Sequence, residues 1–119
     1  MKTVLWISRH EMTEAQLLDL ERVMGGPVSL LPHRDSVTDP SLLREEVGCV
    51  DAIAAVLPPE LLAELLKLAG RKPVLRSLAG REPTGRIVIS PAGRPEPEFR
   101  FVHLGWEQVL RVEIVTKKL

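Results

Sequence analysis

The sequence predicts a single α/β domain of Rossmann-like type over residues 1–119, with a mostly parallel sheet flanked by helices and a C-terminal antiparallel β hairpin or extension. Strand-like apolar runs alternate with helical patterns over the first 80 residues, which is typical of parallel strands joined by helical crossovers. The rest of the chain has no helical pattern and indicates antiparallel strands. The length of 119 residues, with 45% hydrophobic and 27% charged residues, suits one globular domain.

The first strand and helix are predicted within residues 3–24. Residues 3–7 form a continuous β-prone run (Thr-Val-Leu-Trp-Ile), as expected of a strand buried on both faces. Thr13 and Gln16 have the spacing of a capping box, in which each side chain bonds the other's free backbone N–H. Gly25 ends the helix, because glycine fits the left-handed cap. The apolar stripe of this helix consists of Leu17, Leu20, Val23 and Met24.

The strand–helix pattern then repeats along the chain. Asp39 and Pro40 have the residue types of an N-cap and a first helical position, so a short helix is expected up to about Gly48. Pro58-Pro59-Glu60 begins another helix, and Gly70 ends it. The strands of these units are predicted at residues 28–31, 50–57 and 73–78, adjacent and parallel to the first strand.

The C-terminal part is expected to hold antiparallel strands at residues 86–90, 99–102 and 109–115, with a Pro/Gly loop at 91–97. The last two strands are predicted to be joined around Gly105-Trp106. Two interpretations stay open for them: a hairpin on the sheet edge, or an arm that pairs with another subunit.

Charge and cysteine content exclude several classes of protein. Lys and Arg number 16, as do Asp and Glu, and the absence of net charge argues against a protein that coats duplex DNA. The single cysteine, Cys49, excludes a disulfide framework within one chain and a Cys-rich zinc module. The three histidines show no metal-ligand spacing, so no metal is expected.

Other classes are excluded by motifs that the sequence lacks. Neither G-x-x-x-x-G-K-[ST] nor G-x-G-x-x-G is present, so no nucleotide cofactor is expected from these fingerprints. No apolar run approaches the roughly 18 residues that a membrane span requires. We therefore expect no membrane partner and a cytoplasmic protein.

Basic and polar residues gather where the predicted parallel strands end. Ligands of open parallel sheets bind beyond these carboxyl ends, and the N-terminus of the first helix, at Thr13, favours anions. Arginine, histidine and serine without an acidic cluster suit a phosphate-bearing ligand and not a Mg²⁺-dependent mechanism. The candidate ligand-binding residues are Ser8, Arg9, Thr13, His33, Arg34, Arg76, Ser77 and Arg81.

Among these strand ends, His10 is the candidate catalytic residue. It follows a buried strand and precedes a helix cap, so its position is fixed and its imidazole can act as an acid or base. The alternative is that the ring merely supports the turn, with the other polar residues simply solvated. His103 is expected on a strand surface or at an interface. Trp106 is expected either to anchor a hairpin or to take part in a subunit contact.

Residues 4–16, Val-Leu-Trp-Ile-Ser-Arg-His-Glu-Met-Thr-Glu-Ala-Gln, resemble the opening of small CRISPR-associated ring nucleases, which are compact Rossmann-like (CARF-like) proteins. In that family, the first strand leads into His-x-x-Thr-x-x-Gln, here His10, Thr13 and Gln16. The resemblance implies a homodimer that binds cyclic oligoadenylate, a second messenger of type III CRISPR antiviral defence, and linearises it.

The chemistry of such a reaction fits the predicted site. The ring carries its own nucleophile, the ribose 2′-hydroxyl, so cleavage needs no metal. The protein need only align this oxygen with the phosphate, stabilise charge and assist proton transfer. Arginines would supply the charge and His10 the titrating group.

Two alternative functions remain. Arg9-His10-Glu11-x-Thr13 is similar to the Arg-His-Gly-Glu-Thr opening of histidine phosphatases, although the glycine after the histidine is missing. The second alternative is a non-catalytic nucleotide sensor or interaction module, since a Rossmann-like domain can bind without catalysing.

Overall fold

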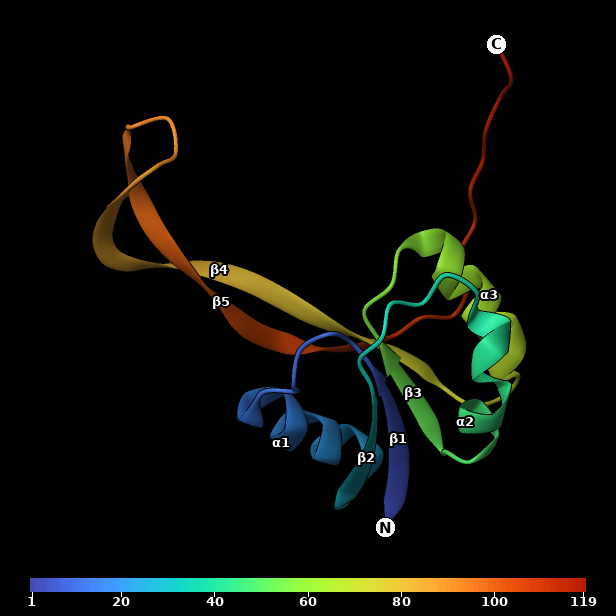
Figure 1. Ribbon diagram of the computed structural model, residues 1–119. Coiled ribbons are helices and arrows are strands. Elements are labelled where there is room, and N and C mark those ends of the chain that lie inside the picture. The colour runs from blue at the N-terminus through green and yellow to red at the C-terminus, as the bar shows by residue number, and fades with distance from the viewer.

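The computed structural model, which describes residues 1–119, is a five-stranded mixed sheet with helices on both faces (Figure 1). The strand order is β2-β1-β3-β4-β5. Strands β1 to β4 pair in parallel, and β5 is antiparallel to β4. The predicted α/β, Rossmann-like fold is thus confirmed. The elements are β1 (Lys2–Ile7), α1 (Glu14–Met24), β2 (Val28–His33), the 3₁₀ helix η1 (Pro40–Leu43), α2 (Arg44–Gly48), β3 (Ala52–Ala55), α3 (Pro59–Ala69), β4 (Val74–Ile89) and β5 (Pro95–Gln108).

Two hydrophobic cores lie on opposite faces of the sheet. Helix α1 covers one face, where Leu20 packs with Val4, Trp6 and Leu75. Helices α2 and α3 cover the other, where Leu65 is among the buried residues that surround Leu5 and Ile53. Burial of one such side chain stabilises the fold by roughly 1.5–3 kcal/mol. Packing in these two cores fixes the positions of the carboxyl ends of β1, β2 and β3 relative to one another.

Helix ends form as the sequence predicts. The Thr13 hydroxyl accepts a hydrogen bond from the Gln16 backbone N–H (3.1 Å), and the Gln16 side-chain oxygen accepts one from the Thr13 N–H (2.9 Å). Gly25 adopts the left-handed conformation with φ 82°, which only glycine reaches without a steric penalty. Asp39 caps η1 by accepting a hydrogen bond from the Ser41 N–H at 3.0 Å.

Strands β4 and β5 form one long hairpin. The predicted strand at 86–90 is the end of β4, which continues without interruption from Val74 to Ile89, and the predicted strand at 99–102 lies inside β5. The turn lies inside the predicted Pro/Gly loop, where the Ser90 N–H donates to the Arg94 carbonyl (2.8 Å) and Gly93 has φ 78°.

Two predictions for the C-terminal part are wrong. Residues 109–115 form no strand, and the chain does not turn at Gly105-Trp106, which lie inside β5. After the Val109 N–H bonds the Val74 carbonyl (2.8 Å), the tail leaves the sheet and packs Val109 and Val112 on the α3-side core. The segment Leu110-Arg111-Val112-Glu113-Ile114 alternates apolar and polar residues as a strand does, but it has no neighbouring strand to pair with, because the tail lies against the helix layer.

The hairpin projects far from the helices and the short strands (Figure 1). The radius of gyration is 17.0 Å, compared with about 13.5 Å for a compact domain of this length. The molecule is therefore a compact body that carries an extended β arm.

No helix combines the length and the apolar character required to cross a membrane.

Candidate functional site

The carboxyl ends of β1 and β3 enclose the crevice in which parallel sheets of this kind bind ligands. β1 lies between β2 and β3, so the connections that follow β1 and β3 lead to opposite faces and leave a switch point between them. A hollow of about 180 Å³ lies there. Its polar lining residues are Ser8, Arg9, Asp35 and Ser36.

His10 directly follows Arg9 in the chain and has a fixed backbone and a free side chain, although it does not line this hollow. Its N–H is 3.2 Å from the Ser8 hydroxyl, to which it donates, and its carbonyl accepts a hydrogen bond from the Trp6 indole N–H at 2.9 Å. Trp6 is itself buried in the core. The imidazole is exposed and makes no hydrogen bond within the chain. It is therefore available to a ligand.

Arg9 and Arg34 differ in how their charges are compensated. Arg9 donates to the hydroxyl of Ser36 at 2.5 Å, a neutral partner that leaves the positive charge available. Arg34 forms an ion pair with Glu11 at 3.0 Å. His33 ends β2, is half-buried, and accepts the Ser8 N–H with its carbonyl. Arg9 thus lines this crevice without an ion pair, and Asp35 is the carboxylate that lines the same hollow.

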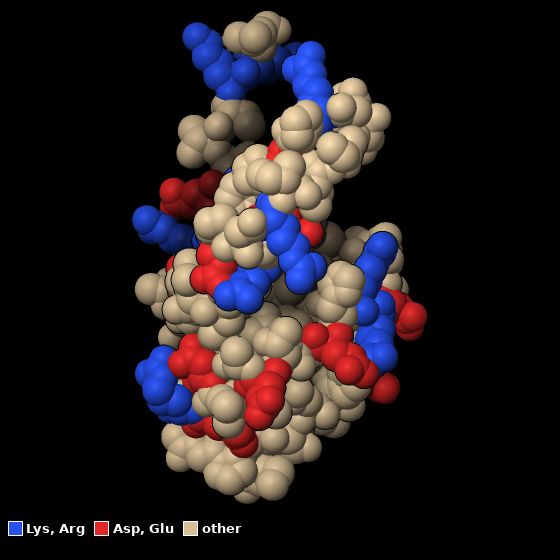
Figure 2. Space-filling view, turned by 90° about the vertical axis from the view of Figure 1, so that its left-hand side faces the viewer, with Lys and Arg blue, Asp and Glu red and all other residues tan.

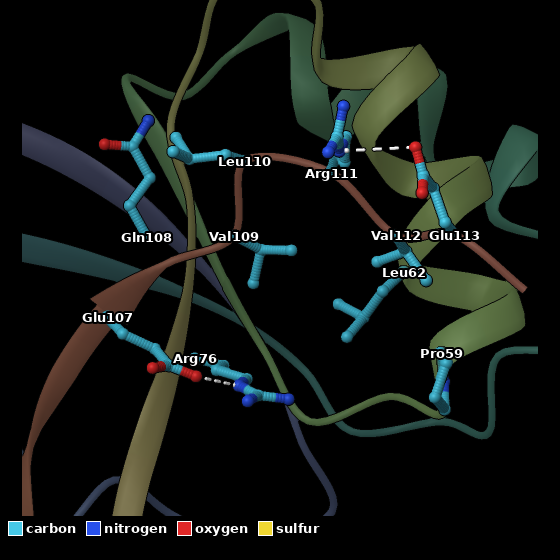
Figure 3. A pocket seen from close by; sticks show the side chains of 10 residues that line it. All are labelled: Pro59, Leu62, Arg76, Glu107, Gln108, Val109, Leu110, Arg111, Val112 and Glu113. Atoms are coloured by element: carbon cyan, nitrogen blue, oxygen red, sulfur yellow. Dashed lines mark hydrogen bonds and ion pairs between the residues drawn. The ribbon is translucent and has the colours of Figure 1, made fainter.

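Arg76 lies elsewhere, on the α3 side of β4. It forms an ion pair with Glu107 at the edge of the largest hollow, about 900 Å³, into which Leu62 and Val109 point (Figure 3). The remaining charged residues of that hollow also pair, Arg111 with Glu113 at 3.4 Å. This hollow offers no unpaired charge to a phosphate.

Ser77 and Thr13 meet on the opposite face, in a hollow of about 440 Å³ between α1 and the hairpin. The Gln16 amide donates to the Ser77 hydroxyl at 3.2 Å, and Ser77 lies 3.2 Å from Nδ1 of His103. Nε2 of His103 lies 2.8 Å from Asp19. The side chains of α1, β4 and β5 thus form one hydrogen-bonded chain.

The proton positions in this chain follow from Asp19. The hydrogen bond from His103, and next that from Arg22, hold the pKa of Asp19 below its ordinary value, so near neutral pH its carboxylate only accepts. Nε2 of His103 must then carry a proton. With a neutral imidazole, Nδ1 accepts, and the Ser77 hydroxyl donates to it. The imidazole side chain is only 9% exposed, which keeps this arrangement rigid.

Arg81 lies outside both hollows, at the point where the hairpin leaves the body. Its guanidinium carbon is 4.9 Å from the centroid of the Phe99 ring, and it has no carboxylate partner. The sequence placed Arg76, Ser77 and Arg81 at one strand end. The structure separates them because β4 continues through all three.

Asp19 and Gln16 were not foreseen as site residues, and His103 was expected on a surface or an interface. One signal for the first two was available: their spacing of three residues places both on one side of α1. No comparable signal links His103 to Asp19, because 84 residues separate them. The pairing depends on the register of β4 and β5.

No group of three or more His, Cys, Asp and Glu side chains is arranged to hold a metal ion. Comparison with known proteins gives no similar family, since no protein-family model, no curated protein and no solved structure matches the chain.

Proposed function

We propose that the protein is a homodimeric, metal-independent ring nuclease that cleaves cyclic oligoadenylate, the second messenger of type III CRISPR antiviral defence, in the cytoplasm. The observation that carries the proposal is the free imidazole of His10, held on a fixed backbone one residue after Arg9, which lines the hollow at the switch point of the sheet. The His10–Thr13–Gln16 spacing that motivated the resemblance supports it further.

The proposed reaction is an attack of a ribose 2′-oxygen on the adjacent phosphorus. The P–O2′ bond forms, and the P–O5′ bond breaks. The 2′-hydroxyl loses its proton to solvent, and His10 supplies a proton to the leaving 5′-oxygen. Arg9 stabilises the negative charge on the phosphoryl oxygens. The product ends in a 2′,3′-cyclic phosphate.

The projecting hairpin supports the dimer. Ile87 and Ile89, near its tip, are 67% and 69% exposed, and a two-stranded ribbon without cover is marginally stable in water. A second copy would provide that cover, and a two-fold dimer presents two equal sites to a ring.

Charge distribution favours a second copy as the partner. Residues 1–75 carry eight Lys and Arg against eleven Asp and Glu, a net charge of −3, while the hairpin residues 76–108 carry five against four, a net charge of +1. Figure 2, seen from the side on which the hairpin projects, shows Lys and Arg side chains at the upper end and most Asp and Glu side chains below them. The arm of one copy thus complements the body of another.

The test is cleavage of a panel of cyclic oligoadenylates in the presence of EDTA. The parent protein should linearise at least one ring, and His10→Ala should slow turnover by about 10²–10⁴-fold. Arg9→Ala should weaken binding and its salt dependence, whereas Arg71→Ala, at the opposite end of the strands, should change neither.

Three results would refute the proposal. Strict dependence on Mg²⁺ or Mn²⁺ would contradict the metal-independent reaction. Turnover of phosphate monoesters through a phosphohistidine at His10 would indicate the phosphatase alternative. A ring that raises the melting temperature but is never consumed would indicate a sensor.

A further inference from the structure

The root of the hairpin, beside α1, carries an aromatic and cationic surface that the fold does not use. Phe101 is 80% exposed and lines the hollow of about 440 Å³. Arg81 is its direct partner across the antiparallel pair, so both side chains project from the same face. Arg81 lies against Phe99 on that face and has no ion-pair partner.

The hydrogen-bonding groups of this hollow hold each other in place, and they retain free donor hydrogens. Gln16 uses its side-chain oxygen on Thr13 and one amide hydrogen on Ser77, which leaves the second amide hydrogen. Thr13 accepts from the Gln16 N–H, so its hydroxyl proton is free. The hollow and its margin therefore offer donors: a hydroxyl, an amide and a guanidinium.

A ligand that matches these features has a flat aromatic face, ring nitrogens or oxygens that accept hydrogen bonds, and a negative charge. A purine nucleotide has all three properties. Exposed aromatic side chains bind nucleobases by stacking, and neighbouring arginines contribute cationic and phosphate contacts. The volume of about 440 Å³ lies within the range of small-molecule sites and suits one nucleotide.

We propose that this face is a nucleotide-binding subsite in which a purine base stacks on Phe101 and its phosphate pairs with Arg81. The adenine edge accepts hydrogen bonds from Thr13 and Gln16. The inference rests on the proposed function, because a cyclic oligoadenylate presents several adenylates. One of them occupies this subsite while a neighbouring phosphate reacts at His10.

The experiment is a titration with adenosine 5′-monophosphate, followed by calorimetry and by proton NMR of the nucleotide. The parent should move the adenine H2 and H8 resonances upfield, the signature of stacking. Phe101→Ala should remove that shift and weaken binding by about 5- to 150-fold, the range measured for loss of one stacked base. Phe101→Tyr should retain both the shift and the affinity.

Matched controls separate stacking from other effects. Leu104→Ala removes an exposed apolar side chain of the same strand and should leave binding unchanged. Ribose 5-phosphate lacks the base and should bind parent and Phe101→Ala equally. Arg81→Gln should reduce the salt dependence of binding. Light scattering of each variant establishes its oligomeric state.

Three outcomes would overturn the subsite: no binding of adenosine 5′-monophosphate, equal binding by parent and Phe101→Ala, or dissociation of the dimer by Phe101→Ala, which would assign this face to the subunit interface. If the parent protein cleaves the ring and the Phe101→Ala variant binds adenosine 5′-monophosphate as the parent does, the subsite is refuted and the nuclease is not. Stacking on Phe101 in a protein that never cleaves the ring supports the subsite and refutes the nuclease.

Discussion

Helix α1 packs on the sheet and also carries residues of the candidate site. The first prediction therefore concerns the free energy of unfolding that is lost when this packing is weakened. Its fully buried residue is Leu20, which is 0% exposed in the core shared with Val4, Trp6 and Leu75. The same helix carries Thr13, Gln16 and Asp19. Leu18, two residues away, is 61% exposed, so it serves as a control of identical chemistry in the same helix.

The expected effect of Leu20→Ala follows from this burial. Three carbons lose burial worth about 0.8 kcal/mol each, and the cavity that remains adds a further cost of about 24 cal/mol per Å³. We expect the free energy of unfolding to fall by about 3–4 kcal/mol. A domain of this size commonly has 5–15 kcal/mol, so the variant should still fold.

The assay is urea unfolding of the parent, Leu20→Ala and Leu18→Ala at one protein concentration, because a dimer makes stability concentration-dependent. Leu18→Ala should change the free energy of unfolding by no more than about 0.5 kcal/mol. Equal losses in the two variants would refute the reasoning, since they would mean that α1 does not pack on the sheet through Leu20.

Two other predictions concern pH and assembly. Because its hydrogen bonds lower the pKa of Asp19 from 3.8, the unfolded chain binds a proton there at a higher pH than the folded chain, so this stabilisation is present above about pH 3.8 and is lost as pH falls further. Asp19→Asn should therefore flatten the decline of urea midpoints below that pH, and an unchanged decline would contradict the assignment. Ile89→Asp, at the exposed tip of the hairpin, should convert a dimer to a monomer in light scattering, whereas Leu42→Asp, an exposed apolar position on the body, should not. A parent protein that is already monomeric would disprove the arm as a dimer contact.

Local signals in the sequence predicted the local features of the fold. The capping box of Thr13 and Gln16, the Gly25 cap and the Asp39-Pro40 helix start depend on neighbouring residues, and each forms as expected. The Ser8-Arg9-His10 segment lies at the carboxyl end of β1 for the same reason, because the buried run before it is unambiguous.

Features that depend on distant pairing could not be predicted in this way. The fourth strand was expected to end at Leu78, which would place Arg76, Ser77 and Arg81 at one carboxyl end. β4 instead runs to Ile89 because β5 pairs with it along the hairpin. In a continuous strand, neighbours project from opposite faces, so Arg76 meets Glu107 on the α3 side and Ser77 meets His103 on the α1 side.

The mass of the earliest cleavage products tests the proposed reaction most directly. Attack by the 2′-oxygen adds no water, so the linear products should end in a 2′,3′-cyclic phosphate and together have the mass of the ring. His10→Ala should form the same products at the reduced rate. First products that are already one water molecule heavier, or a ring that stays intact with the parent protein, would contradict the reaction proposed here.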